Sequence, residues 1–194
     1  MKRLICILFL VAGFFGADFA QSEDLVKDSY RITSGGFWSC TQNLSGGFGE
    51  FGINLLPKEN YFVLRDCIFV MGQGGVLFDD TLDFGALEIG DKLIFGGRYN
   101  CSSFVVRSYG YMSWSVKFYS CLEHKLFSAP IISLGFGGGF ELQYIQNTAF
   151  VLEFGGSSNF LTGKYREKFK LFSNSSPTLT IGFRTFMGKS KKKQ

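Results

Sequence analysis

The chain has 194 residues, of which 24 are Phe, 25 are Gly and only 1 is His, and its formal net charge is +4. Charged residues make up 19% of the chain and aromatic residues 18%, whereas an average soluble domain carries roughly 25% charged residues. After the first twenty residues, the longest unbroken apolar run is Cys67 to Met71, far short of the roughly 18 to 20 residues of a spanning helix. The composition therefore excludes a helical membrane protein and indicates apolar residues that alternate along β-strands.

The N-terminus has the parts of an export signal. A basic start at residues 1–3 precedes an apolar core at residues 4–15, and small residues follow up to Ala20. This order is typical of a secretory signal peptide, so we predict one at residues 1–20, cleaved after Ala20. An anchor helix is the weaker alternative, because the apolar core is too short to span a bilayer comfortably.

Changes in composition divide the rest of the chain. We assign residues 21–45 to an N-terminal periplasmic segment, residues 46–187 to a β-barrel and residues 188–194 to a basic C-terminal tail. The lysines of the tail form a terminal run, whereas a nucleic-acid-binding surface interleaves basic and aromatic residues on a folded face. We therefore predict a solvated tail and no nucleic-acid partner.

The cysteines and the lone histidine give no sign of a metal or a catalytic site. Cys40, Cys67, Cys101 and Cys121 follow the signal peptide, and they form neither a C-x-x-C pair nor a cluster with His124. We predict no metal and no cofactor. As disulfides, these cysteines allow three connectivities, and the sequence does not choose among them. The usual hydrolase and metalloenzyme motifs are missing from the sequence, so we do not expect an enzyme.

Alternation is clearest from Ile132 to Tyr144, where even positions are mostly apolar and aromatic and odd positions carry Gly, Ser, Glu and Gln. This period of two predicts a strand with one apolar face, and seven more stretches fit the same interpretation. The eight predicted strands cover residues 48–55, 61–71, 82–89, 92–99, 103–119, 132–144, 150–155 and 178–187. All three prolines lie between these strands, and Gly90-Asp91 predicts a further turn.

The polar faces of the predicted strands are rich in glycine and poor in charge. A soluble sandwich or barrel needs many charged residues on its outer face, whereas glycine suits a narrow lumen. The charged residues on the Gly/Ser-rich faces are candidate lumen residues: Glu50, Arg107, Lys117, Glu141, Glu153 and Arg184. The simplest interpretation is a lumen plugged by paired charges, and the alternative is a narrow polar path for ions or small solutes. A wide pore is not expected, because side chains fill a lumen of eight strands.

Three stretches carry a family resemblance. Residues 47–51 read GFGEF, residues 134–140 read LGFGGGF, and residues 179–186 read LTIGFRTF. With the export signal, they resemble the small eight-stranded outer-membrane β-barrel proteins of Gram-negative-type bacteria. The resemblance covers about residues 46–187 and implies an all-β fold, an eight-stranded antiparallel transmembrane β-barrel located in the outer membrane.

The resemblance also implies partners. Outer-membrane lipid would surround the barrel, and the barrel-assembly machinery would insert it. Members of the family commonly end on an aromatic residue, whereas this chain continues from Met187 to Gln194. The machinery would therefore recognise an internal segment near Gly182 to Phe186.

Two functions from different classes remain. The first is an integral outer-membrane β-barrel with a structural, small-solute-conducting or surface-interaction role, in which the partner is a small solute or a host surface ligand. The second is a secreted soluble β-barrel that binds an apolar ligand in its interior. For the first, we predict that residues 156–177 form an extracellular connection. An epitope inserted near Ser157 or Ser175 would then be reachable on intact cells.

Overall fold

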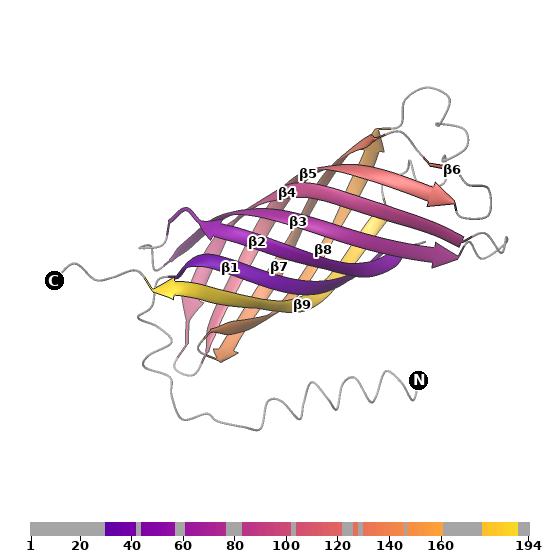
Figure 1. The fold of residues 1–194 in the computed structure, drawn as a ribbon. Helices are drawn as coiled ribbons and strands as arrows, with labels where there is room; N and C mark the ends of the chain where they lie inside the picture. Colours follow the sequence, from indigo (N-terminus) through magenta and orange to yellow (C-terminus); the bar gives the residue numbers. More distant parts are fainter. Residues whose placement is uncertain are drawn as a thin grey trace, which may run out of the picture.

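A computed structural model describes residues 30–41, 44–56, 61–76, 83–101, 104–121, 126–127, 130–145, 147–160 and 176–189. The described residues form one β-sheet that closes into a barrel (Figure 1). The long strands are β1 (Tyr30–Cys40), β2 (Ser45–Asn54), β3 (Phe62–Val76), β4 (Asp83–Asn100), β5 (Val105–Cys121), β7 (Ile131–Ile145), β8 (Thr148–Phe160) and β9 (Ser176–Lys189). The two-residue strand β6 (Leu126–Phe127) pairs with the end of β5.

The wall is antiparallel throughout. Each long strand pairs with its neighbours along the chain, and β1 also pairs with β9, which closes the ring. The prediction of an all-β, eight-stranded antiparallel barrel is therefore confirmed. No helix among the described residues has the length and apolar composition needed to cross a membrane.

Strand β1 lies where we predicted a periplasmic segment. It falls within residues 21–45, yet Gly36 is the register partner of both Gly49 on β2 and Phe183 on β9. The two adjacent glycines at 35 and 36 interrupt the alternation of large side chains, so the period of two is hidden in the sequence. The predicted start of the barrel at residue 46 is wrong, because its wall already includes Tyr30.

Strand β4 runs straight through the turn that we predicted at Gly90-Asp91. Gly90 is the register partner of both Phe69 and Ser115. A Cβ atom on Gly90 would lie 2.5 Å from Ser115 Cβ and 2.8 Å from a ring carbon of Phe69, so glycine is needed for close packing rather than for a turn. Two predicted strands are thus one, and the added β1 keeps the number of long strands at eight.

Other predicted boundaries also differ from those in the structure. Ser157 belongs to β8 and pairs with Gly135 and Ser176, so an inserted epitope there would interrupt the wall. Residues 188 and 189, which we assigned to the tail, belong to β9. The predicted signal peptide, Ser175 and the tail from residue 190 lie outside the described residues.

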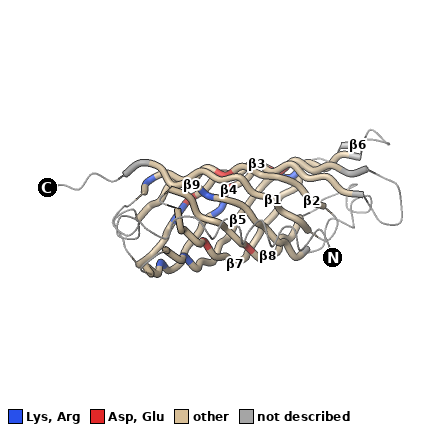
Figure 2. The backbone as a smooth tube through the Cα atoms, turned by 90° about the horizontal axis from the view of Figure 1, so that it is seen from below, with Lys and Arg blue, Asp and Glu red and all other residues tan. Residues whose placement is uncertain are grey.

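Large apolar side chains are exposed on the outside of every long strand. Charged positions are sparse along the wall (Figure 2). Phe136 on β7 is 61% exposed and Phe183 on β9 is 55% exposed. Two neighbouring carboxyl groups are exceptions: Asp66 is exposed between Leu64 and Ile68 on β3, and Asp91 on β4 interacts with it. The inward positions carry the buried charged and hydroxyl residues, together with buried apolar and aromatic side chains such as Val63, Ile94 and Phe186. The exterior of the barrel is therefore apolar, and its charges are gathered inside.

The packing of the interior predicts opposite outcomes for two glycine substitutions. Gly137 faces Tyr111, and a Cβ atom there would lie 2.5 Å from Tyr111 Cζ, whereas nothing lies within 4 Å of a Cβ atom on the outward-facing Gly72. We expect Gly137→Ala to lower the free energy of unfolding by about 1 to 3 kcal/mol through overpacking. Gly72→Ala is the matched control and should change it little. Urea titration of both variants in detergent or lipid measures the difference, and equal losses would contradict the inward placement of Gly137.

Candidate functional site

The interior of the barrel holds the charge that the exterior lacks. Its buried charged side chains are Glu50, Arg65, Glu88, Lys92, Arg98, Arg107, Lys117, Glu141, Glu153 and Arg184. All six residues that the sequence suggested for the lumen are among them. Each occupies a position of inward parity on its strand, because successive side chains of a strand point to opposite faces.

The carboxylate of Glu141 on β7 forms ion pairs with three arginines. Arg65 Nη1 donates a hydrogen bond to Glu141 Oε1 over 2.7 Å, and Arg184 Nη1 donates to the same oxygen. Arg107 Nη1 lies 3.5 Å from Glu141 Oε2. Glu141 and Arg184 are both 0% exposed. Removing these charges from water costs free energy, and the short distances between opposite charges offset that cost.

The network continues across the lumen through Glu50. Arg184 Nη2 and Lys92 Nζ each lie 2.6 Å from a carboxylate oxygen of Glu50. Lys92 Nζ also lies 3.2 Å from Glu153 Oε1, to which the hydroxyl of Tyr109 donates a hydrogen bond of 2.8 Å. We call the connected set the central network: Glu50, Arg65, Lys92, Arg107, Glu141, Glu153 and Arg184. It joins every long strand except β1.

Aromatic rings support the cations of the central network. The guanidinium of Arg107 lies 4.5 Å from the ring centroid of Phe186, and that of Arg184 lies 5.2 Å from Phe37. Such contacts stabilise a desolvated cation. Phe186 is an aromatic residue on the inward face of β9, and its contact with Arg107 explains why it lies there. Its ring centroid is 5.4 Å from that of Tyr30.

Lys117 belongs to a separate ion pair. Its Nζ lies 3.1 Å from Glu88 Oε2, and Ser115 Oγ donates a hydrogen bond to Glu88 Oε1. The structure thus gathers five of the six candidate lumen residues into the central network and leaves Lys117 apart.

Sequence reasoning missed four charged residues of the interior. Glu88 and Lys92 lie on either side of the wrongly predicted turn at residues 90–91. The sequence therefore did not show that both side chains point to the same face of one strand. Arg65 shares the inward face of β3 with Val63 and Cys67, so its neighbours in the alternation give no sign of a polar face. Interpreting residues 83–100 as one strand would have placed Glu88, Lys92 and the fourth residue, Arg98, on the inward side.

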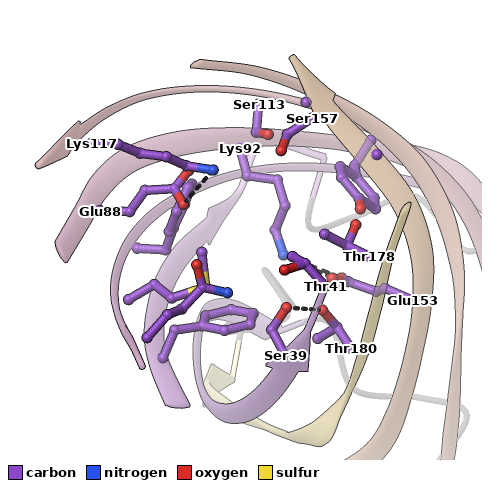
Figure 3. Close-up of a pocket in the computed structure, with 17 residues that line it drawn as sticks. Ser39, Thr41, Glu88, Lys92, Ser113, Lys117, Glu153, Ser157, Thr178 and Thr180 are labelled. Carbon is purple, nitrogen blue, oxygen red and sulfur yellow. Dashed lines mark hydrogen bonds and ion pairs between the residues drawn. The ribbon is translucent and has the colours of Figure 1, made fainter. Parts of the chain in front are cut away.

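A cavity lies between the central network and the barrel end that is remote from Tyr30 and Lys189 (Figure 3). We call it the lumen cavity, and its volume is about 80 Å³, enough for several water molecules. Its polar lining consists of Ser39, Thr41, Gln73, Glu88, Lys92, Tyr111, Ser113, Lys117, Glu153, Ser157, Thr178 and Thr180. In the close-up, Lys92 extends toward Glu153, and Lys117 meets Glu88 on the wall.

The opposite half of the lumen is packed with less polar side chains. Val63, Ile94 and Tyr109 form a buried cluster with Cys67, and Tyr30 packs with Ala149 and Phe186 nearer the chain termini of the barrel. The other side of the central network contains the lumen cavity and, nearer that end of the barrel, a further buried cluster of Leu44, Ala86, Tyr119 and Ile131.

Metal and disulfide chemistry find no support in the described part of the chain. Within it, no group of three or more His, Cys, Asp and Glu side chains is placed to hold a metal ion. Cys40, Cys67 and Cys101 are free thiols there. His124, the one histidine of the sequence, lies outside the described residues.

Comparison with known proteins bears on the fold. Neither a protein-family model nor a curated protein matches the sequence. The N-terminal β-barrel domain of Pseudomonas aeruginosa OprF matches with a TM-score of 0.52 and 10% identity, over 83% of this chain and 100% of that chain. Neisserial surface protein A matches with a TM-score of 0.51 and 12% identity, over 82% of this chain and 97% of that chain. The chain has the fold of the small eight-stranded outer-membrane barrels.

Proposed function

We propose that the chain is an integral outer-membrane β-barrel with a structural or surface-interaction role. The observation that carries this proposal is the inverted distribution of polarity: large apolar side chains are exposed around a closed wall, and the charges are buried inside. A closed barrel with an apolar outer band satisfies every backbone group of its wall and meets the needs of a lipid bilayer. Water would be a poor solvent for such a surface.

The interior favours this proposal over a secreted barrel that binds an apolar ligand. Such a protein needs an apolar cavity, whereas the lumen cavity combines Phe48, Phe69 and Met71 with two lysines, two glutamates and several hydroxyl groups. The ion pairs of Lys92 and Lys117 lie on its walls. An apolar ligand there would leave these polar groups without compensation.

The central network also favours a structural or surface-interaction role over the conduction of small solutes. Its side chains meet across the lumen with ion-pair distances of 2.6 to 3.5 Å among Glu50, Arg65, Lys92 and Arg107 and their partners. On the side of the central network that faces the chain termini of the barrel, the cluster around Tyr109 and Ile94 packs inside the lumen. A solute would have to separate buried ion pairs in order to pass.

A surface-interaction role would use the connection between β8 and β9. Residues 161–175 lie outside the described part, but their sequence contains Lys164, Arg166, Lys168 and Lys170 beside a single acidic residue, Glu167. An anionic surface ligand is the partner that this composition suits. With termini on the periplasmic side, this connection is extracellular. Export through the signal peptide and insertion by the barrel-assembly machinery complete the proposal.

The location can be tested by fractionation. We expect the full chain, after export, to appear in the outer-membrane fraction and to partition into the detergent phase. Its electrophoretic mobility should change on boiling, because a closed barrel resists unfolding by detergent at low temperature. Recovery from the aqueous phase as a folded protein would contradict the proposal and favour the secreted barrel.

A further inference from the structure

We propose that residues 161–172, in the connection between β8 and β9, dock on an apolar patch of the wall outside the bilayer, and that this contact presents their basic side chains to an anionic ligand. The inference rests on the surface-interaction role proposed above and names the surface that positions the binding segment. The patch lies at the end of the barrel remote from Tyr30 and Lys189. We call it the upper patch, and it consists of Leu87 on β4, Val116 and Phe118 on β5, Ile132 on β7 and Phe160 on β8.

The upper patch is continuous across four strands. Leu87 is the register partner of Phe118, and Ile132 is the register partner of both Val116 and Phe160. All five side chains are exposed, Ile132 by 60% and Phe160 by 53%. Single exposed apolar residues are normal on a protein, whereas a contiguous group of them marks an interaction surface.

Exposed aromatic residues mark the two edges of the lipid-facing band. Tyr61 and Tyr99 are exposed near the end of the barrel that holds the chain termini, and Trp38 and Trp114 are exposed further along the wall. Tyr99 pairs with Val106, and Trp114 follows Val106 by eight residues on β5. A tilted strand rises about 2.5 Å per residue along the barrel axis, so the two aromatic levels are about 20 Å apart. This spacing suits the apolar band of about 25 Å that aromatic girdles enclose in such barrels.

The upper patch lies beyond this band. Phe118 follows Trp114 by four residues on β5, which is about 10 Å along the axis. At the same end of the wall, the outward positions of other strands carry small or polar residues, such as Gly74 on β3 and Ser158 on β8, both exposed. The lipid-facing surface therefore ends near Trp114, and the large apolar side chains beyond it need another cover.

The connection between β8 and β9 starts inside the upper patch. Phe160 is the last residue of β8, and the chain returns to the wall at Ser176, the register partner of Ser157. Val116 is only two strands away from Phe160, about 10 Å at the usual strand spacing. The connection, residues 161–175, could span about 50 Å if extended, so its length allows it to fold back over the patch.

The sequence of the connection has both an apolar and a basic component. Residues 161–172 read LTGKYREKFKLF. Its large apolar and aromatic residues are Leu161, Tyr165, Phe169, Leu171 and Phe172, and its basic residues are Lys164, Arg166, Lys168 and Lys170. The upper patch carries no charge, so it can accept the first group and leaves the second group free for an anionic ligand.

The size of the upper patch also favours a short segment over a second protein. A stable protein–protein interface uses about 20 to 30 residues on each side, whereas the upper patch has five members. A segment that is already tethered at Phe160 loses less translational freedom on docking than a separate protein does.

Photo-crosslinking from position 118 tests the contact. We expect the full barrel in phospholipid vesicles, with p-benzoylphenylalanine in place of Phe118, to form an intramolecular cross-link to residues 161–172 that mass spectrometry identifies. The matched control carries the same amino acid in place of Phe140, which is 55% exposed within the apolar band on β7 and should cross-link to lipid. Heat-modifiable mobility shows that each sample is folded. A folded barrel without a cross-link from position 118 to residues 161–172 would overturn the inference, whether that position reacts with lipid, with residues 122–130 or with a second barrel.

Binding of dextran sulfate, a soluble polyanion, tests the consequence for the ligand. Phe160→Ser in the upper patch should weaken binding about 10-fold, because basic side chains that are not held in place lose conformational freedom on binding. Phe154→Ser is the matched control on the same strand, since Phe154 is 52% exposed but lies within the apolar band, and it should bind like wild type. Equal binding by the two variants would overturn the role of the patch in presenting the basic residues.

A third variant separates this inference from the proposed role. Replacing all four basic residues of the segment by glutamine should abolish binding of dextran sulfate. If that variant binds like wild type, the anionic ligand is wrong for this segment, and the cross-link from position 118 still decides the docking. Fractionation decides the membrane location independently of both.

Discussion

Replacing Phe136 by lysine is expected to lower the free energy of unfolding of the barrel by about 2 to 4 kcal/mol, the cost of a lysine near the middle of a lipid-facing wall. Phe136 is 61% exposed in the middle of β7, where it lies beside Met112 on β5 and Gly156 on β8. If lipid covers this surface, the ammonium group must enter hydrocarbon. Reversible urea titration in phospholipid vesicles measures the change. Phe183→Lys, at the 55%-exposed position on β9, should show a loss of similar size.

The matched control is Phe136→Leu, which keeps the position apolar and should cost far less than the lysine variant. In a water-facing wall the order would be reversed, because an exposed lysine is more soluble than an exposed phenylalanine. Lysine variants as stable as wild type would therefore place water, rather than lipid, around β7 and β9 and would revive the secreted barrel.

The sequence predicted the fold class because the strands of the second half alternate cleanly. Along β7, apolar residues such as Phe136 and Phe140 alternate with Gly135, Gly139 and Glu141, and the structure gives the expected outward and inward faces. The alternation arises because one face of the strand forms the apolar exterior of the barrel and the other face lines its interior. Any strand that keeps a strict period of two can be read in this way.

One physical cause explains why β1 was not predicted and why β4 was predicted as two strands. Glycine is a turn signal in sequence, but inside a narrow barrel it is also the residue that lets facing walls approach. At Gly90 the neighbours Phe69 and Ser115 occupy the space of a side chain, and at Gly35 a Cβ atom would lie 2.9 Å from the backbone oxygen of Phe183. These contacts join residues that are far apart in the chain, so local sequence cannot separate packing glycines from turn glycines.

The central network was partly predictable. The alternation along each strand placed Glu50, Glu141 and Arg184 on the inward face, but it does not specify with which residue each of them forms an ion pair. Arg184 reaches Glu50 and Glu141 because β9 lies between β1 and β8 in the closed ring, with β2 and β7 one strand further in each direction. The partners follow from closure and register, which a single sequence does not contain.

The largest effect is expected at Glu141. Replacing it by glutamine removes the carboxylate that Arg65, Arg107 and Arg184 share, and it leaves three buried guanidinium groups facing an uncharged amide. Removing one partner of a buried ion pair typically costs 3 to 5 kcal/mol. We therefore expect Glu141→Gln to lower the free energy of unfolding by about 3 to 5 kcal/mol, measured by urea titration of the variant in lipid vesicles.

A second substitution separates electrostatic loss from altered packing. In the Glu141→Gln background, Arg107→Gln removes the cation with the longest distance to Glu141, 3.5 Å. If excess positive charge causes the instability, the double variant should recover part of the loss, so the two changes would not be additive. Additive losses would mean that the arginines contribute mainly by packing, as Arg107 does against Phe186.

Asp66→Asn is the control for the chemical change itself, because it also converts a carboxylate to an amide. Asp66 points outward on β3, where it interacts with the carboxyl group of Asp91 on β4, and its register partners are Ile53 on β2 and Leu93 on β4. A carboxylate facing lipid is costly, so its removal should leave the free energy of unfolding unchanged or raise it. A loss as large as that of Glu141→Gln would contradict the assignment of Glu141 to a charge-balancing interior and of Asp66 to the lipid-facing wall.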